Sequence, residues 1–213
     1  MHRQKWYEKP SGQLILHEEK ILLDRMLKTT RRNDLLQIGG PHDDRLIENT
    51  CVTRAFFLDL HYHHPRNLAY VQADFDCLPI RSEAMDVVLL IHALEWSDDP
   101  KATLQEVYRV LKPNGKLIIF GFNPWSLWRL WSLRVNKLYS PGKITQKLNG
   151  LGCEIDLYQT LCFYPRIPFI EVMGQFLFPY LGAIYLISAT KNVPGMMPLS
   201  EKYMDSGLLA RSG

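Results

Sequence analysis

The sequence has few cysteines, no long apolar run and no strong excess of one charge, and each absence excludes a class of protein. Its four cysteines form no CxxC pair and no zinc-ligand spacing, so no structural zinc site is expected. No run reaches the roughly 20 apolar residues that a membrane-spanning helix needs. A net charge of +3 with mostly scattered Lys and Arg does not predict nucleic-acid binding.

The N-terminal residues and the neighbours of the cysteines indicate the cellular compartment and the state of the thiols. The first ten residues are polar and charged where a secretory signal has an apolar core, so we expect a cytoplasmic protein. Three of the four cysteines adjoin apolar or strand-like residues. We therefore expect mainly buried, reduced thiols among Cys51, Cys77, Cys153 and Cys162.

Residues 74–124 carry the clearest prediction of the fold. Residues 87–91 are a continuous apolar run of strand length, as in a parallel strand that is covered on both faces. Residues 102–111 show helical apolar spacing, and Pro113-Asn114-Gly115 ends that helix before a second strand at 117–120. Strand, helix and strand in this order form a right-handed parallel crossover. The class is therefore α/β.

The rest of the chain extends this unit into a doubly wound, Rossmann-like, mostly parallel seven-stranded sheet with helices on both faces. The other predicted strands are 34–38, 55–60, 68–72, 153–162 and 182–191, and a short helix covers 143–151. An N-terminal helix at 11–28 is expected to be capped by Ser11, with Ile15, Glu18 and Leu22 in its half-apolar stripe. We expect one domain over 1–191, with a helical extension (1–30), aromatic-rich cap insertions (125–181) and a loosely held tail (192–213).

Glycine and acidic residues follow three successive strands at the edge where an open parallel sheet binds ligands. Gly39-Gly40 allows close approach of the backbone. Asp59 is placed to accept hydrogen bonds from both hydroxyls of a ribose. Asp74 can accept a hydrogen bond from an exocyclic amine, and Phe75 offers a ring face to a purine. Each signal is weak alone, but together they indicate an adenosine-containing ligand.

These strand ends belong to a longer pattern. It comprises Leu-Leu-Gln-Ile-Gly-Gly (35–40), Phe-Leu-Asp (57–59), Gln-Ala-Asp-Phe-Asp-Cys-Leu-Pro-Ile (72–80), Met-Asp-Val-Val-Leu-Leu-Ile-His-Ala-Leu-Glu-Trp (85–96) and Glu-Val-Tyr-Arg-Val-Leu-Lys-Pro-Asn-Gly-Lys-Leu (106–117). Over residues 30–125 the chain resembles the class I S-adenosylmethionine-dependent methyltransferases of type 11. The resemblance implies S-adenosylmethionine as cofactor and S-adenosylhomocysteine as product.

The resemblance also implies roles for individual residues. It places the methionine part of the cofactor at Gly39 and its neighbours, including Gly40 and Gln37, and the ribose at Asp59 and Leu60. It places the adenine at Asp74 and Phe75, and the sulfonium near His92. The family usually has an acidic residue at position 37 and glycines at 41 and 43, where this chain has Gln37, Pro41 and Asp43. These departures predict weaker or reshaped cofactor binding.

Histidines supply the candidate catalytic groups. His92 is the best-placed general base by position and pKa range, with Glu95 second; the alternative is that His92 packs or forms hydrogen bonds at a strand end. His61, His63 and His64 lack acidic partners at ligand spacing, so no metal site is predicted.

Trp125, Trp128 and Trp131 lie at helical spacing in the expected cap. They either pack over the sheet as core or form an amphipathic lid over an apolar substrate or an anionic membrane surface. The leading hypothesis is an enzyme that methylates a small-molecule or lipid-like acceptor. The alternative is a non-catalytic methyltransferase fold that binds a partner or membrane. A nicotinamide dehydrogenase is disfavoured, because the loop lacks G-x-G-x-x-G. The sequence indicates neither the acceptor nor the oligomeric state.

Overall fold

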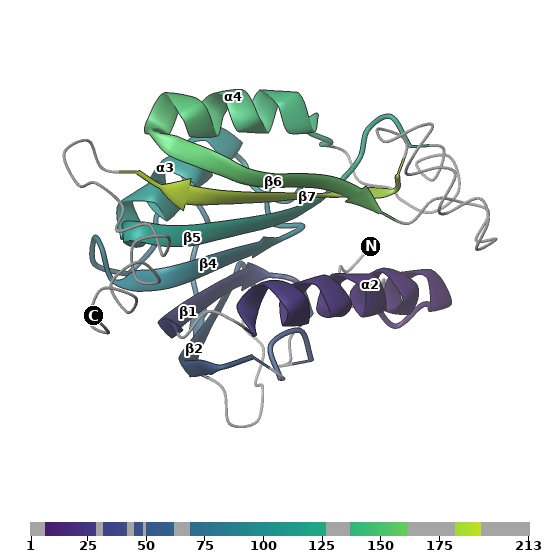
Figure 1. Cartoon of the computed structure of the whole chain (residues 1–213), viewed down its shortest axis with the longest axis horizontal. Coiled ribbons are helices and arrows are strands. Elements are labelled where there is room, and N and C mark those ends of the chain that lie inside the picture. The colour runs from purple at the N-terminus through teal and green to yellow at the C-terminus, as the bar shows by residue number, and fades with distance from the viewer. Residues whose placement is uncertain are drawn as a thin grey trace, which may run out of the picture.

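A computed structural model describes residues 7–28, 32–41, 45–48, 50–61, 69–126, 137–161 and 182–192. A seven-stranded sheet runs through these segments in the order β3-β2-β1-β4-β5-β7-β6 (Figure 1). Several predictions lie outside the described residues: Asp43, His63, His64, Cys162, Trp128, Trp131, most of the 125–181 cap and all but the first residue of the 192–213 tail.

Five strands of the sheet are parallel and one of the remaining two is antiparallel to both of its neighbours. The parallel strands are β1 (Arg32–Gly39), β2 (Val52–Asp59), β3 (Ala69–Gln72), β4 (Met85–Ile91) and β5 (Leu111–Phe122). β7 (Ile184–Lys191) pairs antiparallel with β5 and with β6 (Cys153–Leu161). The predicted mostly parallel, seven-stranded α/β sheet is confirmed.

Alternation along the central strands divides the core into two layers. Leu36, Val88 and Ile119 face one layer, together with residues of α3 and α4. Leu35, Val87 and Ile118 face the other, together with residues of α2. Because successive side chains of a strand point to opposite faces, each apolar run feeds both layers. Helices cover both faces of the sheet (Figure 1), as the sequence predicts.

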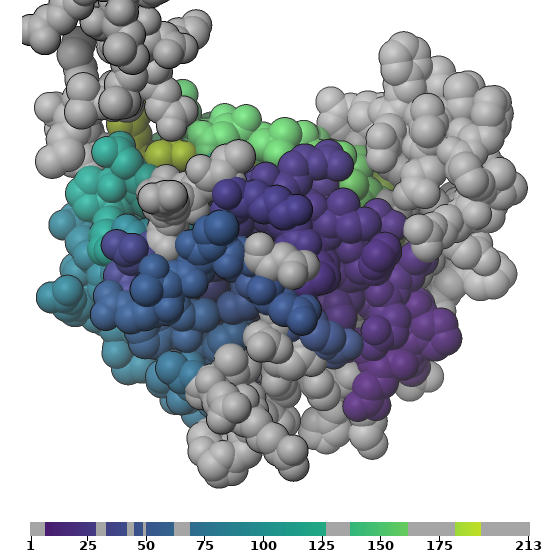
Figure 2. Space-filling view, turned by 60° about the horizontal axis from the view of Figure 1, so that its bottom comes forward, coloured from purple at the N-terminus to yellow at the C-terminus, as the bar shows by residue number. Residues whose placement is uncertain are grey.

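The first described helix, α2 (Pro10–Leu27), begins earlier than predicted. Lys9 is its N-cap and makes no side-chain cap bond, so the prediction that Ser11 caps the helix is wrong. Pro10 has a fixed φ that suits the first helical position, so the helix can begin one residue earlier. Its buried stripe is also rotated from the predicted one and contains Glu19 in place of Glu18. Figure 2 shows α2 (purple) beside the blue early part of the chain on this face of the molecule.

The two other described helices lie on the opposite face. α3 (Pro100–Val110) is capped by the Asp99 carboxylate, whose Oδ1 accepts from Lys101 N at 2.8 Å. α4 (Pro141–Leu151) ends at Gly152, which has φ +90°. Both begin with a proline and start two residues before the predicted helices.

The chain leaves α3 directly into β5. Leu111 opposes Met85 and Lys116 opposes Val87, so Pro113-Asn114-Gly115 forms a bulge within β5, not a separate turn. The Lys191 ammonium, which is buried, donates to the carbonyls of Tyr108 (3.0 Å) and Leu111 (2.8 Å). This links the end of α3 to β7 and satisfies carbonyls that a helix end leaves without partners.

The described cysteines only partly match the expectation of buried thiols. Cys153 is buried, and burial raises the pKa of its thiol to about 11. Cys51 and Cys77 are exposed, so the expectation is wrong for them, because they lie before β2 and in a loop turn, away from the core. Within the described segments, no helix is long and apolar enough to cross a membrane.

Candidate cofactor site at the carboxyl edge of the sheet

The glycine pair that ends β1 has the backbone conformation of a ligand-binding turn. Gly39 and Gly40 have φ values of +73° and +84°, which side chains with a Cβ rarely adopt. A Cβ on Gly39 would lie 2.8 Å from the carbonyl oxygen of Ile91, and one on Gly40 would lie 2.9 Å from Ile91 Cβ. The turn therefore lies directly against the end of β4, and only glycine fits at either position.

The Gln37 side chain stabilises this turn through hydrogen bonds. Its Nε2 donates to the carbonyls of Gly39 (3.1 Å) and Pro41 (3.3 Å), and its side chain is buried. A carboxylate, which the family usually has at this position, could not donate these bonds. The Oε1 of Gln37 is buried without a hydrogen-bond partner. Such an orphaned acceptor fits a donor group, and the ammonium of the methionine moiety is one.

Asp59 ends β2 and is buried at the same edge. Its Oδ1 accepts from the backbone N–H of Leu60 at 2.6 Å, which fixes the carboxylate at the start of the following loop. Gln72 Nε2 donates to the Leu60 carbonyl at 3.1 Å, so the ends of β2 and β3 are also linked. Asp59 and Leu60 are therefore adjacent to the end of β3.

Asp74 and Phe75 follow β3 but differ in exposure. Asp74 is exposed, so its carboxylate is accessible to a ligand amine. Phe75 is 1% exposed and packs in the core layer that contains Leu78 and Leu94. The ring face that the sequence assigns to a purine is thus covered by protein. A contact of Phe75 with adenine would have to use its backbone.

Two residues outside the predicted site hold the loop that carries Asp74. Arg109 of α3 donates to the carbonyls of Leu78 (3.1 Å) and Ile80 (2.8 Å), and Glu106 accepts from Leu78 N at 2.9 Å. The hydrogen bond with Arg109 is the main cause that lowers the pKa of Glu106. Both residues lie in the family-like segment 106–117, but spacing alone gives no sign that they reach this loop.

His92 follows β4 and is held by residues from two other elements. Its Nε2 lies 2.8 Å from Glu19 Oε1 of α2, and its Nδ1 lies 4.0 Å from Glu95 Oε1. Its ring stacks on Phe122 at 3.8 Å between centroids, and its φ is +50°. His92 is 1% exposed and Glu19 is 0% exposed. The sequence left His92 open as a base or a hydrogen-bonding residue; here its ring is hydrogen-bonded.

The charges around His92 determine its protonation. Burial lowers the pKa of the imidazole, but the charge and hydrogen bond of Glu19, followed by those of Glu95, outweigh burial and raise it to about 9. A pKa raised in this way favours the imidazolium form of His92 at neutral pH. Glu95 is tied in turn to β5, because its Oε1 accepts from Phe122 N at 2.7 Å.

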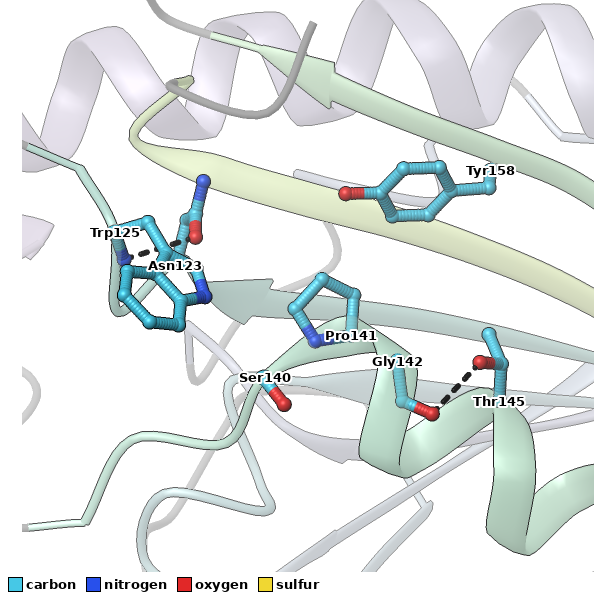
Figure 3. Close-up of a pocket in the computed structure, with 7 residues that line it drawn as sticks. All are labelled: Asn123, Trp125, Ser140, Pro141, Gly142, Thr145 and Tyr158. Carbon is cyan, nitrogen blue, oxygen red and sulfur yellow. Dashed lines mark hydrogen bonds between the residues drawn. The ribbon is translucent and has the colours of Figure 1, made fainter.

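A cavity of about 590 Å³ lies beyond the carboxyl end of β5, between the start of α4 and β6 (Figure 3). The lining is mostly apolar and consists of Asn123, Trp125, Ser140, Pro141, Gly142, Thr145 and Tyr158. Trp125 is 69% exposed at the rim, and its backbone N–H donates to Asn123 Oδ1 at 3.1 Å. None of the predicted cofactor residues lines the cavity, but Asn123 directly follows Phe122, on which His92 stacks.

In the part of the chain that the structure describes, no group of three or more His, Cys, Asp or Glu side chains is placed to hold a metal ion. His63 and His64 are not among those residues, whereas the exposed His61 is.

The sheet order, the left-handed glycine pair and the acidic strand ends define a class I S-adenosylmethionine-dependent methyltransferase fold. Residues 54–119 match a family model described as a methyltransferase domain. This match lies within the stretch that carries the resemblance in the sequence, and it supports a class I S-adenosylmethionine-dependent methyltransferase.

Similar proteins support the family. A protein of Escherichia coli named "Uncharacterized protein YafS" is 35% identical over 132 residues, which are 57% of this chain and 55% of that protein. A malonyl-[acyl-carrier protein] O-methyltransferase of Enterobacter lignolyticus is 32% identical over 113 residues, or 49% of this chain and 43% of that protein. The chain thus spans about half the length of these two relatives.

A solved structure supports the fold. The S-adenosylmethionine-dependent methyltransferase from Archaeoglobus fulgidus superposes with a TM-score of 0.63 at 19% identity, covering 83% of this chain and 94% of that one. At this identity the likeness concerns the fold alone.

Proposed function

We propose that the protein transfers a methyl group from S-adenosylmethionine to a small-molecule or lipid-like acceptor. The observation that carries the proposal is the glycine turn of Gly39 and Gly40 against Ile91, at the same sheet edge as the buried Asp59 carboxylate. Backbone that approaches so closely, next to an acid at the end of β2, suits the methionine and ribose parts of the cofactor.

In this proposal each cofactor group has a partner. The Gly39–Gly40 turn and the orphaned Gln37 oxygen receive the methionine moiety. Asp59 and the Leu60 backbone receive the ribose, while Asp74 and the Phe75 backbone receive the adenine. His92 lies beside the sulfonium, since the Gly39 position contacts both Ile91 and Ala93.

Methyl transfer needs few reactive side chains. Bound S-adenosylmethionine would supply an activated methyl group on its sulfonium, and its transfer to a lone pair of the acceptor would leave the thioether product. The protein therefore contributes mainly alignment and exclusion of water. The buried segment 91–95, held by Glu19 and by β5, is suited to this role because it is fixed from both sides.

We assign the acceptor to the cavity beyond β5. Its volume of about 590 Å³ lies within the range of about 300–1,000 Å³ that is common for small-molecule sites. The aromatic faces of Trp125 and Tyr158, with few polar groups, suit an apolar or acyl acceptor (Figure 3). The relative named for malonyl-acyl-carrier-protein methylation agrees with an acyl-type acceptor.

Calorimetry with S-adenosylmethionine and S-adenosylhomocysteine tests the proposal. We expect both to bind, and Asp59→Asn to weaken both at least tenfold, because asparagine carries no charge and keeps only one acceptor oxygen for the two ribose hydroxyls. Asp98→Asn is the control, because the Asp98 side chain is fully exposed and pairs only loosely with Lys137 at 3.3 Å. Absence of binding at millimolar ligand would contradict the proposal. Binding without transfer to any acceptor pool would favour a non-catalytic binding module.

A further inference from the structure

Glu19 is a carboxylate in the middle of the buried face of α2. Its neighbours on that face include Ile15, Leu16, Leu22 and Leu23, all of which belong to the core layer. A carboxylate at 0% exposure is costly unless a charged partner compensates for the loss of water. Its partner is His92 Nε2 at 2.8 Å, so the burial of Glu19 depends on this contact.

The contact joins three elements at the cofactor edge. His92 N donates to Phe120 O at 2.9 Å, and its ring stacks on Phe122, so it is packed against β5. Glu95 accepts a hydrogen bond from Phe122 N. It lies near Nδ1 of the His92 ring, the nitrogen that does not contact Glu19. Glu19 adds α2 to this contact network. The segment that it holds, 91–93, is the one against which Gly39 packs.

We propose that Glu19 is a positioning residue of the cofactor site, which holds His92 as an imidazolium and thereby fixes segment 91–93 against the glycine turn. This inference rests on the proposed function for the identity of the cofactor. An imidazolium has no lone pair on its ring nitrogens, so His92 does not take a proton from the acceptor. The acceptor either needs no base or loses its proton elsewhere.

The charges near this cluster are compatible with a cationic cofactor. Two acidic side chains, Glu19 and Glu95, flank the His92 ring, and acidic groups at this place suit a positively charged cofactor. The titratable groups that the described elements bring toward the cluster are Glu19 from α2, Glu95 after β4, Tyr139 before α4 and Tyr185 of β7. The last two interact with Glu95.

Nitrogen-15 NMR of histidine-labelled full-length protein tests the protonation of His92 without any assay of activity. A His92→Gln variant identifies the His92 signals among the seven histidines. We expect both ring nitrogens of His92 to stay protonated from pH 6 to 8 in the wild type. In Glu19→Gln we expect the ring to titrate within that range. A His92 ring that is neutral at pH 7.5 in the wild type would overturn the inference. This measurement uses the wild-type protein, so it does not depend on whether Glu19→Gln folds.

Binding of S-adenosylmethionine tests the positioning role. We expect Glu19→Gln to weaken it about tenfold and to make the affinity depend on pH between 6 and 8. Glu18→Gln removes the same charge from the adjacent, half-buried position, and we expect neither effect. A folded Glu19→Gln protein with unchanged, pH-independent affinity would overturn the inference. Wild-type protein that binds no S-adenosylmethionine would contradict the proposed function, while the NMR result still decides what Glu19 does to His92.

Discussion

Gly39 and Gly40 have left-handed backbone, and Ile91 fills the space where a side chain would begin. Gly150 differs in both respects: it lies in the helix α4, and a Cβ there meets nothing within 4 Å. The two kinds of glycine therefore separate a conformational requirement from a general effect of adding a methyl group.

We expect Gly39→Ala to lower the free energy of unfolding by about 2 kcal/mol or more, through left-handed strain and the contact with Ile91 O. Affinity for S-adenosylmethionine should fall at least tenfold with it. The control Gly150→Ala should stabilise the protein by about 0.5–1 kcal/mol, because alanine is favoured in helices. Urea unfolding measures the free energy of unfolding and calorimetry measures the affinity. Equal effects of the two substitutions would refute the role of the turn.

A second residue-level prediction concerns Gln37. Gln37→Glu restores the acidic residue usual in the family but removes two bonds to the carbonyls of Gly39 and Pro41. We expect the free energy of unfolding to fall by about 1–3 kcal/mol, the usual cost of leaving buried polar groups unpaired. Gln146→Glu on the exposed side of α4 should change it by less than about 0.5 kcal/mol. If Gln37→Glu is as stable as the wild type in denaturant, the glutamine does not hold the turn.

Single residues were predictable from the sequence only where backbone or position constrains them. Gly39, Gly40 and Asp59 are fixed by strand ends, so counting along the chain finds them. Glu19 was not predictable, because a mid-helix glutamate is ordinarily solvated and its partner is 73 positions away. A rotation of the helix stripe by one residue exchanged Glu18 for Glu19.

Among the elements, the loop after β3 depends on α3 for its shape. Arg109 reaches two of its carbonyls and pairs with Glu106 at 2.8 Å, so the helix holds the segment that follows Asp74 and Phe75. The start of α3 was predictable from local sequence, because Asp99-Pro100 is a strong N-cap signal. The hydrogen bond from Arg109 to the Ile80 carbonyl is a tertiary contact, and no sequence periodicity indicates it.

We expect Arg109→Met to weaken binding of S-adenosylmethionine about threefold to tenfold, because the loop that follows Asp74 and Phe75 loses two carbonyl contacts with the helix. The melting temperature should change little, since the side chain is one-third exposed. Arg81→Met, an exposed arginine in the same loop, is the control and should leave affinity unchanged. Equal affinities for the two variants in a titration would show that the loop keeps its shape without Arg109.

For the whole molecule, the raised pKa of His92 makes global stability depend on pH. The folded-state value of about 9 exceeds the ordinary value near 6.5, so the folded protein binds a proton more tightly than the unfolded chain. The resulting stabilisation, up to about 3 kcal/mol, is complete below about pH 6.5 and is lost as the pH rises through 9.

Urea unfolding at pH 6.5 and 9.5 measures this dependence. We expect the wild type to be less stable at pH 9.5, and the difference to shrink in Glu19→Gln, where the main cause of the raised pKa is gone. Stability that stays level or rises over this range in the wild type would contradict the ion pair. The comparison uses the difference between proteins because other groups titrate in both.

The sheet as a whole was predictable in class and strand positions, since buried parallel strands leave continuous apolar runs such as 87–91. The order in which strands pair was not encoded locally. β7 inserts between β5 and β6, and Tyr185 places its hydroxyl where a side chain on Gly121 would lie. Gly121 reads as an ordinary strand glycine until the partner strand is known.

The position of β7 gives the molecule an order of assembly that differs from its order of synthesis. Among the described strands, β6 pairs with β7 alone, although β6 precedes it in the chain by more than 20 residues. While the polypeptide is still being made, β6 therefore has no strand on which to form, and the edge of β5 lies open to other chains. Pulse-labelling hydrogen exchange should find the amides of β6 protected no earlier than those of β7. We therefore expect aggregation during synthesis to remain a hazard until β7 enters the sheet.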